Sequence, residues 1–362
     1  MANAKITIIS DIHMSNNASY AWFQDKQAAL LIGMLDSAAN NTKLDELLLL
    51  GDAFDLWVYP IDVAPWTFEE VVNQWRRPAK GTTQSVIGAL KRCIEKVPNV
   101  YYINGNHDMQ VTASQVESIA SGGNRIHWTT PQAYRQKYGG RLHVEHGHGV
   151  DMFNAPDNST DTLNGMPLGY YITRLVASAA DPDTKQTKLN GMLLGFQKKY
   201  LTGAKQRDGD DQKLGEILVN AIIDLLTADL LIHGKLVTDD TEIVFADPSR
   251  NVTIGQVKDA YHSLLGTWHT GGWDQLLDNM LVCAIPNGLD WYAKNLLEGQ
   301  NPPQAVVFGH THHSEQNIYG ARKYGNDGCW CNSPKNSRPS CIALDVTPSA
   351  IDVTLVNWIV SG

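Results

Sequence analysis

The sequence has few features of a membrane, secreted or disulfide-bonded protein. It contains no run of eighteen apolar residues, so it predicts no integral membrane segment. Its first residues, MANAKITIIS, contain only a short apolar run and no small-residue cleavage site, so we expect no secretory signal and a cytoplasmic location. The five cysteines are an odd number in a long chain, which argues against a disulfide scaffold. Cys329, Cys331 and Cys341 lack the fourth thiolate of a structural zinc site.

Positive charge is also scarce. The 29 Lys and Arg residues are outnumbered by 38 Asp and Glu residues, which gives a formal net charge of -9. Proteins that bind duplex DNA or anionic membranes hold them with clustered basic side chains. We therefore expect no long nucleic-acid partner. The hydrophobic content of 43% and the charged content of 19% are those of an ordinary globular protein, and they leave the oligomeric state open.

The order of apolar segments predicts an α/β domain interrupted by a helical insertion. Buried strands are predicted at 5–10, 47–50, 100–103, 142–145, 305–308, 341–346 and 351–357. The sequence pattern predicts helices over 26–39, 83–96, 213–232 and 274–298, the last interrupted at Pro286-Asn287-Gly288. A chain of 362 residues favours two domain-sized units. We expect an α/β domain made of residues 1–154 and 304–362, with residues 155–303 as a large, mostly helical insertion.

Five polar clusters each follow one of the predicted strands. They are Asp11-Ile12-His13, Gly51-Asp52-Ala53-Phe54-Asp55, Gly105-Asn106-His107-Asp108, His146-Gly147-His148 and Gly309-His310-Thr311-His312. The carboxyl ends of strands in an open α/β sheet converge on one crevice, so we expect these side chains to lie together. Carboxylate, imidazole and amide oxygen form a donor set that suits Mn, Fe, Zn, Co or Ni. Seven such donors are too many for one ion and sufficient for two ions that share a bridging carboxylate.

These clusters, in this order, resemble the pattern of the calcineurin-like metallophosphoesterase superfamily: DxH, GDxxD, GNH(D/E), H and GHxH. The resemblance implies a two-sheet β-sandwich flanked by helices, with residues 305–362 in the second sheet. It implies that one metal ion is held by Asp11, His13 and His312. It implies that the other ion is held by Asn106, His146 and His310, with Asp52 as the bridge. We expect Mn to support activity best in vitro.

The resemblance and the donor set predict a metal-dependent phosphoesterase that acts on a small phosphodiester or phosphomonoester. Two ions about 3.5–4 Å apart lower the pKa of a shared water and stabilise the charge that develops during in-line attack of a bridging hydroxide on phosphorus. The leaving oxygen also needs a proton. His107 is the expected general acid, and Asp55 is expected to fix its tautomer. Asp108 is expected to be structural.

Two alternatives stay open. The segment LLLLGDAFDLWVY at 47–59, with Gly149 to Phe153, resembles the branch that hydrolyses UDP-2,3-diacylglucosamine. The chain would then be a pyrophosphatase acting on a nucleotide-linked sugar or lipid, although that branch often has Arg at the position of His107 and has a shorter insertion. The second alternative is a non-catalytic scaffold of the same fold. Such scaffolds lose ligands or the acid, whereas every one is present here.

Other side chains are candidates for contact with a substrate. His148 and His313 adjoin expected ligands and are equally compatible with a supporting role and a structural one. Trp57 and Trp66 are expected to pack within a loop, with an apolar wall for the leaving group as the alternative. The Gly- and Trp-rich loop 266–273 is a less favoured candidate for a lid. Positive charge from the insertion could come from Arg174, Lys198, Lys199 and Arg207.

Overall fold

The computed structural model divides the chain into two compact units. It describes residues 3–156, 163–201, 211–268, 273–332 and 339–358. The first unit consists of Met1–Leu56, Trp66–Gly147 and Leu289–Gly362, and the second consists of Trp57–Pro65 and His148–Gly288. Residues 269–272 of the candidate lid loop lie outside the described residues, as does Arg207. None of the helices in the described ranges is long and apolar enough to cross a membrane.

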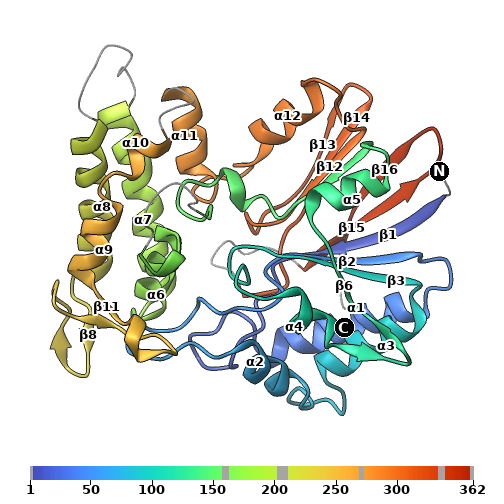
Figure 1. The fold of residues 1–362 in the computed structure, drawn as a ribbon, viewed down its shortest axis with the longest axis horizontal. Helices are drawn as coiled ribbons and strands as arrows, with labels where there is room; N and C mark the ends of the chain where they lie inside the picture. Colours follow the sequence, from blue (N-terminus) through green and yellow to red (C-terminus); the bar gives the residue numbers. More distant parts are fainter. Residues whose placement is uncertain (1–2, 157–162, 202–210, 269–272, 333–338, 359–362) are drawn as a thin grey trace. The chain divides into compact units, whose positions relative to one another are not determined.

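A six-stranded sheet forms the centre of the first unit (Figure 1). Its strands, in spatial order, are β16 (Ile351–Asn357), β15 (Ser340–Val346), β1 (Ala4–Ile9), β2 (Glu46–Leu50), β3 (Asn99–Ile103) and β6 (His127–Trp128). β1, β2, β3 and β6 are parallel, and β15 pairs antiparallel with β1. The carboxyl ends of β1, β2 and β3 therefore meet at one edge of the sheet.

A second, four-stranded sheet completes the sandwich, as predicted. Its spatial order is β13 (Ser314–Tyr319), β14 (Arg322–Asp327), β12 (Ala305–Phe308) and β7 (Leu142–Val144). Side chains from both sheets, including Ile8, Leu48, Val144 and Val307, form one buried core. The expectation that all of 305–362 belongs to this sheet is wrong for β15 and β16. These strands instead extend the first sheet, because β15 pairs with the otherwise open edge of β1.

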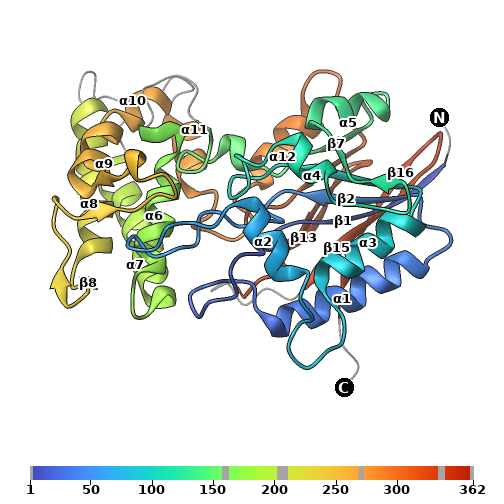
Figure 2. The same ribbon diagram turned by 60° about the horizontal axis from the view of Figure 1, so that its bottom comes forward.

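Helices cover the other face of the six-stranded sheet. Figure 2 shows α1 and α3 lying along it, and their apolar residues share a buried core with Leu47, Leu49 and Val100. The helices of the first unit are α1 (Asp25–Asn40), α2 (Phe68–Trp75), α3 (Val86–Lys96), α4 (Ala113–Glu117), α5 (Pro131–Lys137) and α12 (Asp290–Glu298). A small hairpin of β4 (Ala120–Ser121) and β5 (Asn124–Arg125) lies against α3. The first unit is thus a two-sheet sandwich flanked by helices.

The second unit is mostly helical. Its helices are α6 (Leu168–Ala177), α7 (Pro182–Phe196), α8 (Asp211–Thr227), α9 (Ile254–Tyr261), α10 (Leu264–Trp268) and α11 (Trp273–Leu281). Short strands form two hairpins, β8 (Leu231–Ile232) with β9 (Lys235–Leu236) and β10 (Glu242–Ile243) with β11 (Val252–Thr253). Single turns are η1 (His148–Val150), η2 (Leu163–Gly165), η3 (Gln197–Leu201) and η4 (Pro248–Arg250). The helix predicted over 213–232 ends at Thr227, because Asp229 adopts a left-handed backbone with φ of 59° before β8.

The division into units differs from the predicted boundaries at three places. Residues 148–154, predicted as part of the α/β domain, belong to the second unit. Residues 289–303, predicted as insertion, belong to the first unit. The reason is that Tyr292 of α12 stacks on Phe308 of β12, with ring centroids 5.4 Å apart. Residues 57–65, predicted as part of the α/β domain, belong to the second unit.

Arg174 explains why the 57–65 segment packs with the second unit. Its side chain is 0% exposed and sits in α6. Nε donates to the carbonyl of Tyr59 at 2.6 Å, and one terminal nitrogen donates to the carbonyls of Pro60, Val63 and Val244 at 2.8–3.0 Å. Buried carbonyls need donors, and this guanidinium supplies several at once. Arg174 is therefore a structural residue, and its charge is not presented to solvent.

We predict that Arg174→Met lowers the free energy of unfolding by about 3 kcal/mol or more, because it leaves several buried carbonyls without a donor. Urea unfolding followed by circular dichroism measures the loss. Arg250→Met is the matched control in the same unit, since Arg250 donates to the single carbonyl of Asn164 at 2.8 Å. Equal losses for the two variants would contradict the role assigned to Arg174.

Candidate metal centre

The predicted site residues all follow strands of the first unit. Asp11 and His13 follow β1, Asp52 and Asp55 follow β2, and Asn106 and His107 follow β3. His146 follows β7, and His310 and His312 follow β12. All nine residues are buried, with exposed fractions of 7% or less. Both sheets of the sandwich therefore contribute loops to this candidate centre.

Backbone hydrogen bonds join the loops that follow β1 and β2. The amide of Asp11 donates to the carbonyl of Gly51 at 3.1 Å, and the amide of His13 donates to the carbonyl of Asp52 at 2.8 Å. Asp108 holds the loops after β2 and β3 together, because its carboxylate accepts from the amides of Ala53 and Gly105. This is the structural role expected of Asp108.

Five residues of the centre adopt a left-handed backbone conformation. They are Asp11 (φ 52°), His13 (59°), Asp52 (51°), His310 (69°) and His312 (59°). Such a conformation costs a non-glycine residue about 1–2 kcal/mol. Strain of this kind concentrates where a function requires particular side-chain directions. The local backbone is thus bent in a way that directs these side chains inward.

Two carboxylate oxygens face three imidazole nitrogens at the centre. Asp11 Oδ1 lies 3.2 Å from His312 Nε2, 3.8 Å from His13 Nε2 and 3.9 Å from His146 Nε2. Its other oxygen, Oδ2, accepts a hydrogen bond from the amide of His310 at 3.0 Å. Within the described part of the chain, Asp11 Oδ1 itself makes no hydrogen bond. One oxygen of Asp11 is thus anchored and the other is directed at the imidazoles.

Asp52 lies between the two groups of expected ligands. Its Oδ2 is 3.1 Å from His146 Nε2 and 3.7 Å from His13 Nε2, while Oδ1 accepts from the amide of His107 at 2.8 Å. Gly105 permits this approach, because a Cβ at that position would lie 2.2 Å from Asp52 Oδ1. Asp52 Oδ2 thus faces both His13 and His146, and its role as the bridge stays a prediction.

The donor set fits metal ions. The Nε2 atoms of His13 and His312 are 3.0 Å apart. Atoms that bind one ion at about 2.1 Å in octahedral geometry lie about 3 Å apart, which is the spacing found here. Asp11, Asp52 and His146 also form a group whose donor atoms lie within 4.8 Å of one another. These buried oxygens and nitrogens therefore provide a donor set of the kind that borderline divalent cations prefer.

Asn106 and His310 adjoin members of this set. The ring of His310 lies against that of His146, with centroids 5.2 Å apart. Asn106 is 2% exposed and directly precedes His107, whose amide is bonded to Asp52. Both residues are thus close to His146 and Asp52, and their assignment to the second ion stays a prediction.

Asp55 contacts a ligand and the expected acid at the same time. Its Oδ1 lies 3.0 Å from His107 Nδ1, and its Oδ2 lies 3.0 Å from His13 Nδ1. A carboxylate accepts hydrogen bonds, so both Nδ1 atoms carry the proton in this arrangement. Nε2 is then the reactive nitrogen of each ring. Asp55 thereby fixes two imidazoles in one orientation, as the sequence led us to expect for His107.

Burial and mutual attraction shift the pKa values of the centre in opposite directions. Burial favours the neutral acid, but His146, His13 and His312 hold the pKa of Asp11 well below its usual value. Burial opposes charge on His146 as well, yet Asp52 and Asp11 raise its pKa to about 10. The carboxylates are therefore deprotonated, and the histidines that face them carry the compensating positive charge as imidazolium ions. Protons and metal cations therefore compete for the same nitrogen atoms.

The sequence did not point to three neighbours of the centre. The half-buried ring of Trp22 lies 4.9 Å from His13, 5.5 Å from His107 and 5.6 Å from His312. Ser10, which precedes Asp11 in the sequence, donates from Oγ to Asp327 at 2.7 Å. Cys331 Sγ lies 3.9 Å from His312 Nδ1. None of these residues belongs to the five polar clusters, so only the folded chain reveals their position.

The other candidates are distributed over both units. Trp57 is fully buried, as expected for loop packing, and belongs to the second unit. Trp66 packs against the core on the helix side of the six-stranded sheet. His148 is half-buried in the second unit, and His313 is half-buried in the first. Exposed positive charges of the insertion occur at Lys198 and Lys199 of η3.

We predict that metal binding releases protons. At pH 7 the His146 imidazolium must lose its proton before Nε2 can bind an ion, because its pKa is about 10. Affinity should therefore rise about tenfold per pH unit for each proton displaced. Zinc titration of metal-free protein in weak buffer with a pH indicator measures the release. His146→Ala should reduce the proton release, and His127→Ala, which changes an exposed histidine, should leave it unchanged. A metal affinity that does not depend on pH would contradict the prediction.

Comparison with known proteins identifies the family of the first unit. The family model described as calcineurin-like phosphoesterase matches residues 4–314, a range that contains all five polar clusters. A search of curated proteins found no match. Among solved structures, a dimetal phosphatase from Danio rerio is 10% identical, covers 98% of this chain and 99% of its own, and has a TM-score of 0.37.

Two further solved structures are similar at the same low level. GAP50, described as the anchor in the inner membrane complex of Plasmodium, is 10% identical over 100% of this chain and 87% of its own, with a TM-score of 0.35. Phosphopantetheinyl hydrolase from Mycobacterium tuberculosis is 11% identical over 96% and 97%, with a TM-score of 0.29. The family assignment rests on the family model, because all three TM-scores are below 0.5. Since that model spans most of the chain, the protein belongs to the calcineurin-like phosphoesterase family.

Proposed function

We propose that this chain hydrolyses small phosphodiesters or phosphomonoesters, with two metal ions held by the candidate centre. The observation that carries the proposal is the convergence of Asp11 Oδ1 and Asp52 Oδ2 on the Nε2 atoms of three buried histidines. Family membership supports metal-dependent phosphoester hydrolysis as the class of reaction. The substrate preference and the identity of the metals belong to the proposal.

Seven residues would hold the ions, and the donors of five of them, Asp11, His13, Asp52, His146 and His312, face one another. Asp11, His13 and His312 would hold one ion, Asn106, His146 and His310 the other, and Asp52 would contact both. Two such ions supply a water of lowered pKa and stabilise negative charge on the phosphoryl oxygens. The protein keeps the donors in place by burial and by anchoring the second oxygen of each carboxylate, on the amide of His310 for Asp11 and on the amide of His107 for Asp52.

His107 would protonate the leaving oxygen. Asp55 accepts from its Nδ1, so Nε2 is the nitrogen left to carry and deliver a proton. His107 also lies edge-on to His13, with ring centroids 4.5 Å apart, which places the acid beside a metal ligand. The Trp22 ring packs beside both. A general acid beside the metal ligands could protonate the alkoxide as it leaves.

The proposal is tested by hydrolysis with defined metals. Metal-stripped protein is reconstituted in turn with Mn, Zn, Co, Ni and Mg and assayed on bis-p-nitrophenyl phosphate and p-nitrophenyl phosphate. Metal-dependent turnover is expected, and the ratio of the two rates distinguishes a diesterase from a monoesterase. A UDP-linked sugar assayed in parallel tests the pyrophosphatase alternative through release of UMP. Two bound ions without turnover of any substrate would contradict the proposal and favour the scaffold.

We predict that His107→Ala slows hydrolysis of esters with poor leaving groups about 10²–10⁴-fold, because these need a proton from the general acid. Activated aryl esters should lose much less. Rates for a series of esters of increasing leaving-group pKa measure the difference, and metal analysis checks that both ions are still bound. His127→Ala, which removes an exposed histidine on β6, is the control. Equal losses across the series would show that His107 is not the acid.

A further inference from the structure

The three metal-facing histidines share one arrangement of their two ring nitrogens. Each directs Nε2 toward the carboxylates of Asp11 and Asp52, as described above. Each has its Nδ1 beside a different acceptor. His13 Nδ1 lies 3.0 Å from the Asp55 carboxylate, His146 Nδ1 lies 2.8 Å from the Leu50 carbonyl, and His312 Nδ1 lies 3.9 Å from Cys331 Sγ.

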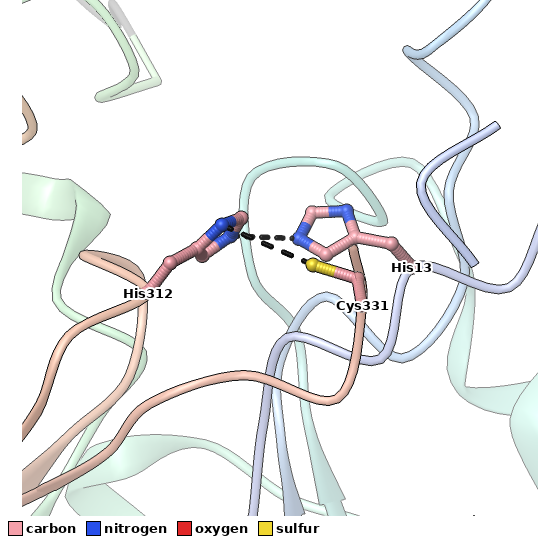
Figure 3. A group of neighbouring side chains, drawn as sticks. All are labelled: His13, His312 and Cys331. Carbon is pink, nitrogen blue, oxygen red and sulfur yellow. Dashed lines mark hydrogen bonds between the residues drawn. The ribbon is translucent and has the colours of Figure 1, made fainter. Parts of the chain in front are cut away.

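Figure 3 shows the third of these arrangements. The His312 ring faces both His13 and Cys331, with a dashed line to each. Cys331 comes from the segment after β14, whereas His312 follows β12 and His13 follows β1. Three loops distant in sequence therefore meet at the His312 ring.

The backbone holds the Cys331 sulfur in this place. The residue before it, Trp330, donates its amide to the carbonyl of Asp11 at 3.0 Å, and the residue after it, Asn332, donates to the carbonyl of Trp22 at 2.7 Å. Cys331 is 6% exposed and forms no disulfide. Its side chain is thus fixed between two segments that themselves contact the metal-facing histidines.

The chemistry of a metal-bound imidazole explains what the sulfur does. A histidine that binds a metal through Nε2 donates its Nδ1–H to a neighbouring acceptor, and that bond fixes the tautomer and the ring orientation. The sulfur of a cysteine is a weak acceptor, and bonds to it are longer than bonds to oxygen. The 3.9 Å separation lies at the long end of the range for a hydrogen bond to sulfur.

We propose that Cys331 is a positioning residue of the first metal ion: its sulfur accepts the Nδ1–H of His312 and so keeps Nε2 as the metal-binding atom. The inference rests on the proposed function, because it presumes that His312 binds an ion. It differs from direct coordination, in which sulfur would be a ligand beside His13 and His312. The contact favours positioning because the sulfur lies at Nδ1, whereas the nitrogen that faces Asp11 is Nε2.

Two substitutions separate this role from simple packing. Cys331→Val keeps an apolar side chain of similar volume and removes the acceptor. Cys331→Ser keeps an acceptor and loses volume. A packing role predicts that Val is tolerated better than Ser, whereas a positioning role predicts the reverse. Cys341→Val is the matched control, because Cys341 is also 6% exposed and lies in β15.

The readout is metal affinity, measured by chelator competition with zinc and cobalt on metal-free protein. Cys331→Val is expected to lower the affinity for one of the two ions about 10–100-fold. Cys331→Ser should lower this affinity clearly less, and Cys341→Val should leave it unchanged. Thermal unfolding checks that each variant folds. Where Val is not accommodated, Cys331→Ala also removes the acceptor and should show the same loss.

Several outcomes would overturn the proposal. Unchanged affinity in Cys331→Val, or an equal loss in Cys331→Ser, would remove the positioning role. A sulfur-to-cobalt charge-transfer band in the cobalt protein that disappears in Cys331→Ser would instead make Cys331 a ligand. Wild-type protein that binds fewer than two ions would overturn the proposed function together with this inference. Two bound ions with Cys331→Val unaffected would overturn this inference alone.

Discussion

The burial of five carboxylates in one small region is the constraint on which the rest of the first unit depends. They belong to Asp11, Asp52, Asp55, Asp108 and Asp327. Buried charge is costly unless it is paired and hydrogen-bonded. The loops meet this demand in different ways: imidazoles face Asp11 and Asp52, backbone amides donate to Asp108, and burial together with Asp11 raises the pKa of Asp327 well above its usual value. The positions of the loops follow from these pairings.

The sequence predicted the polar clusters well because each consists of neighbouring residues directly after an apolar strand. Asp11 with His13, and His310 with His312, needed only local spacing and the rule that parallel strands share one edge. Trp22 and Cys331 could not be predicted in this way. They reach the same histidines through loops whose course depends on long-range pairs, such as the amide of Asn332 with the carbonyl of Trp22. Local pattern carries no information about such pairs.

The same distinction applies to the architecture. The pattern that predicts strands at 341–346 and 351–357 reports burial of one face and not the identity of the neighbouring strand, and the placement implied by the resemblance put β15 and β16 in the wrong sheet. Likewise, Arg174 appears in the sequence as a positive charge. Its role as a donor to the carbonyls of the 57–65 segment emerges only when α6 packs against that segment. The sequence predicted the types of element, but it did not predict which elements or side chains pair with one another.

The left-handed backbone of five residues of the candidate centre has an evolutionary consequence. Glycine adopts that conformation without steric cost, and asparagine tolerates it better than most residues do. Glycine at Asp11, His13 or His312 would therefore relieve backbone strain, but it would also leave the buried partners of these side chains unpaired. A lineage released from selection for activity would gain stability from such a change only where the partners were replaced as well. Inactive relatives of this architecture should therefore have lost several of these residues together.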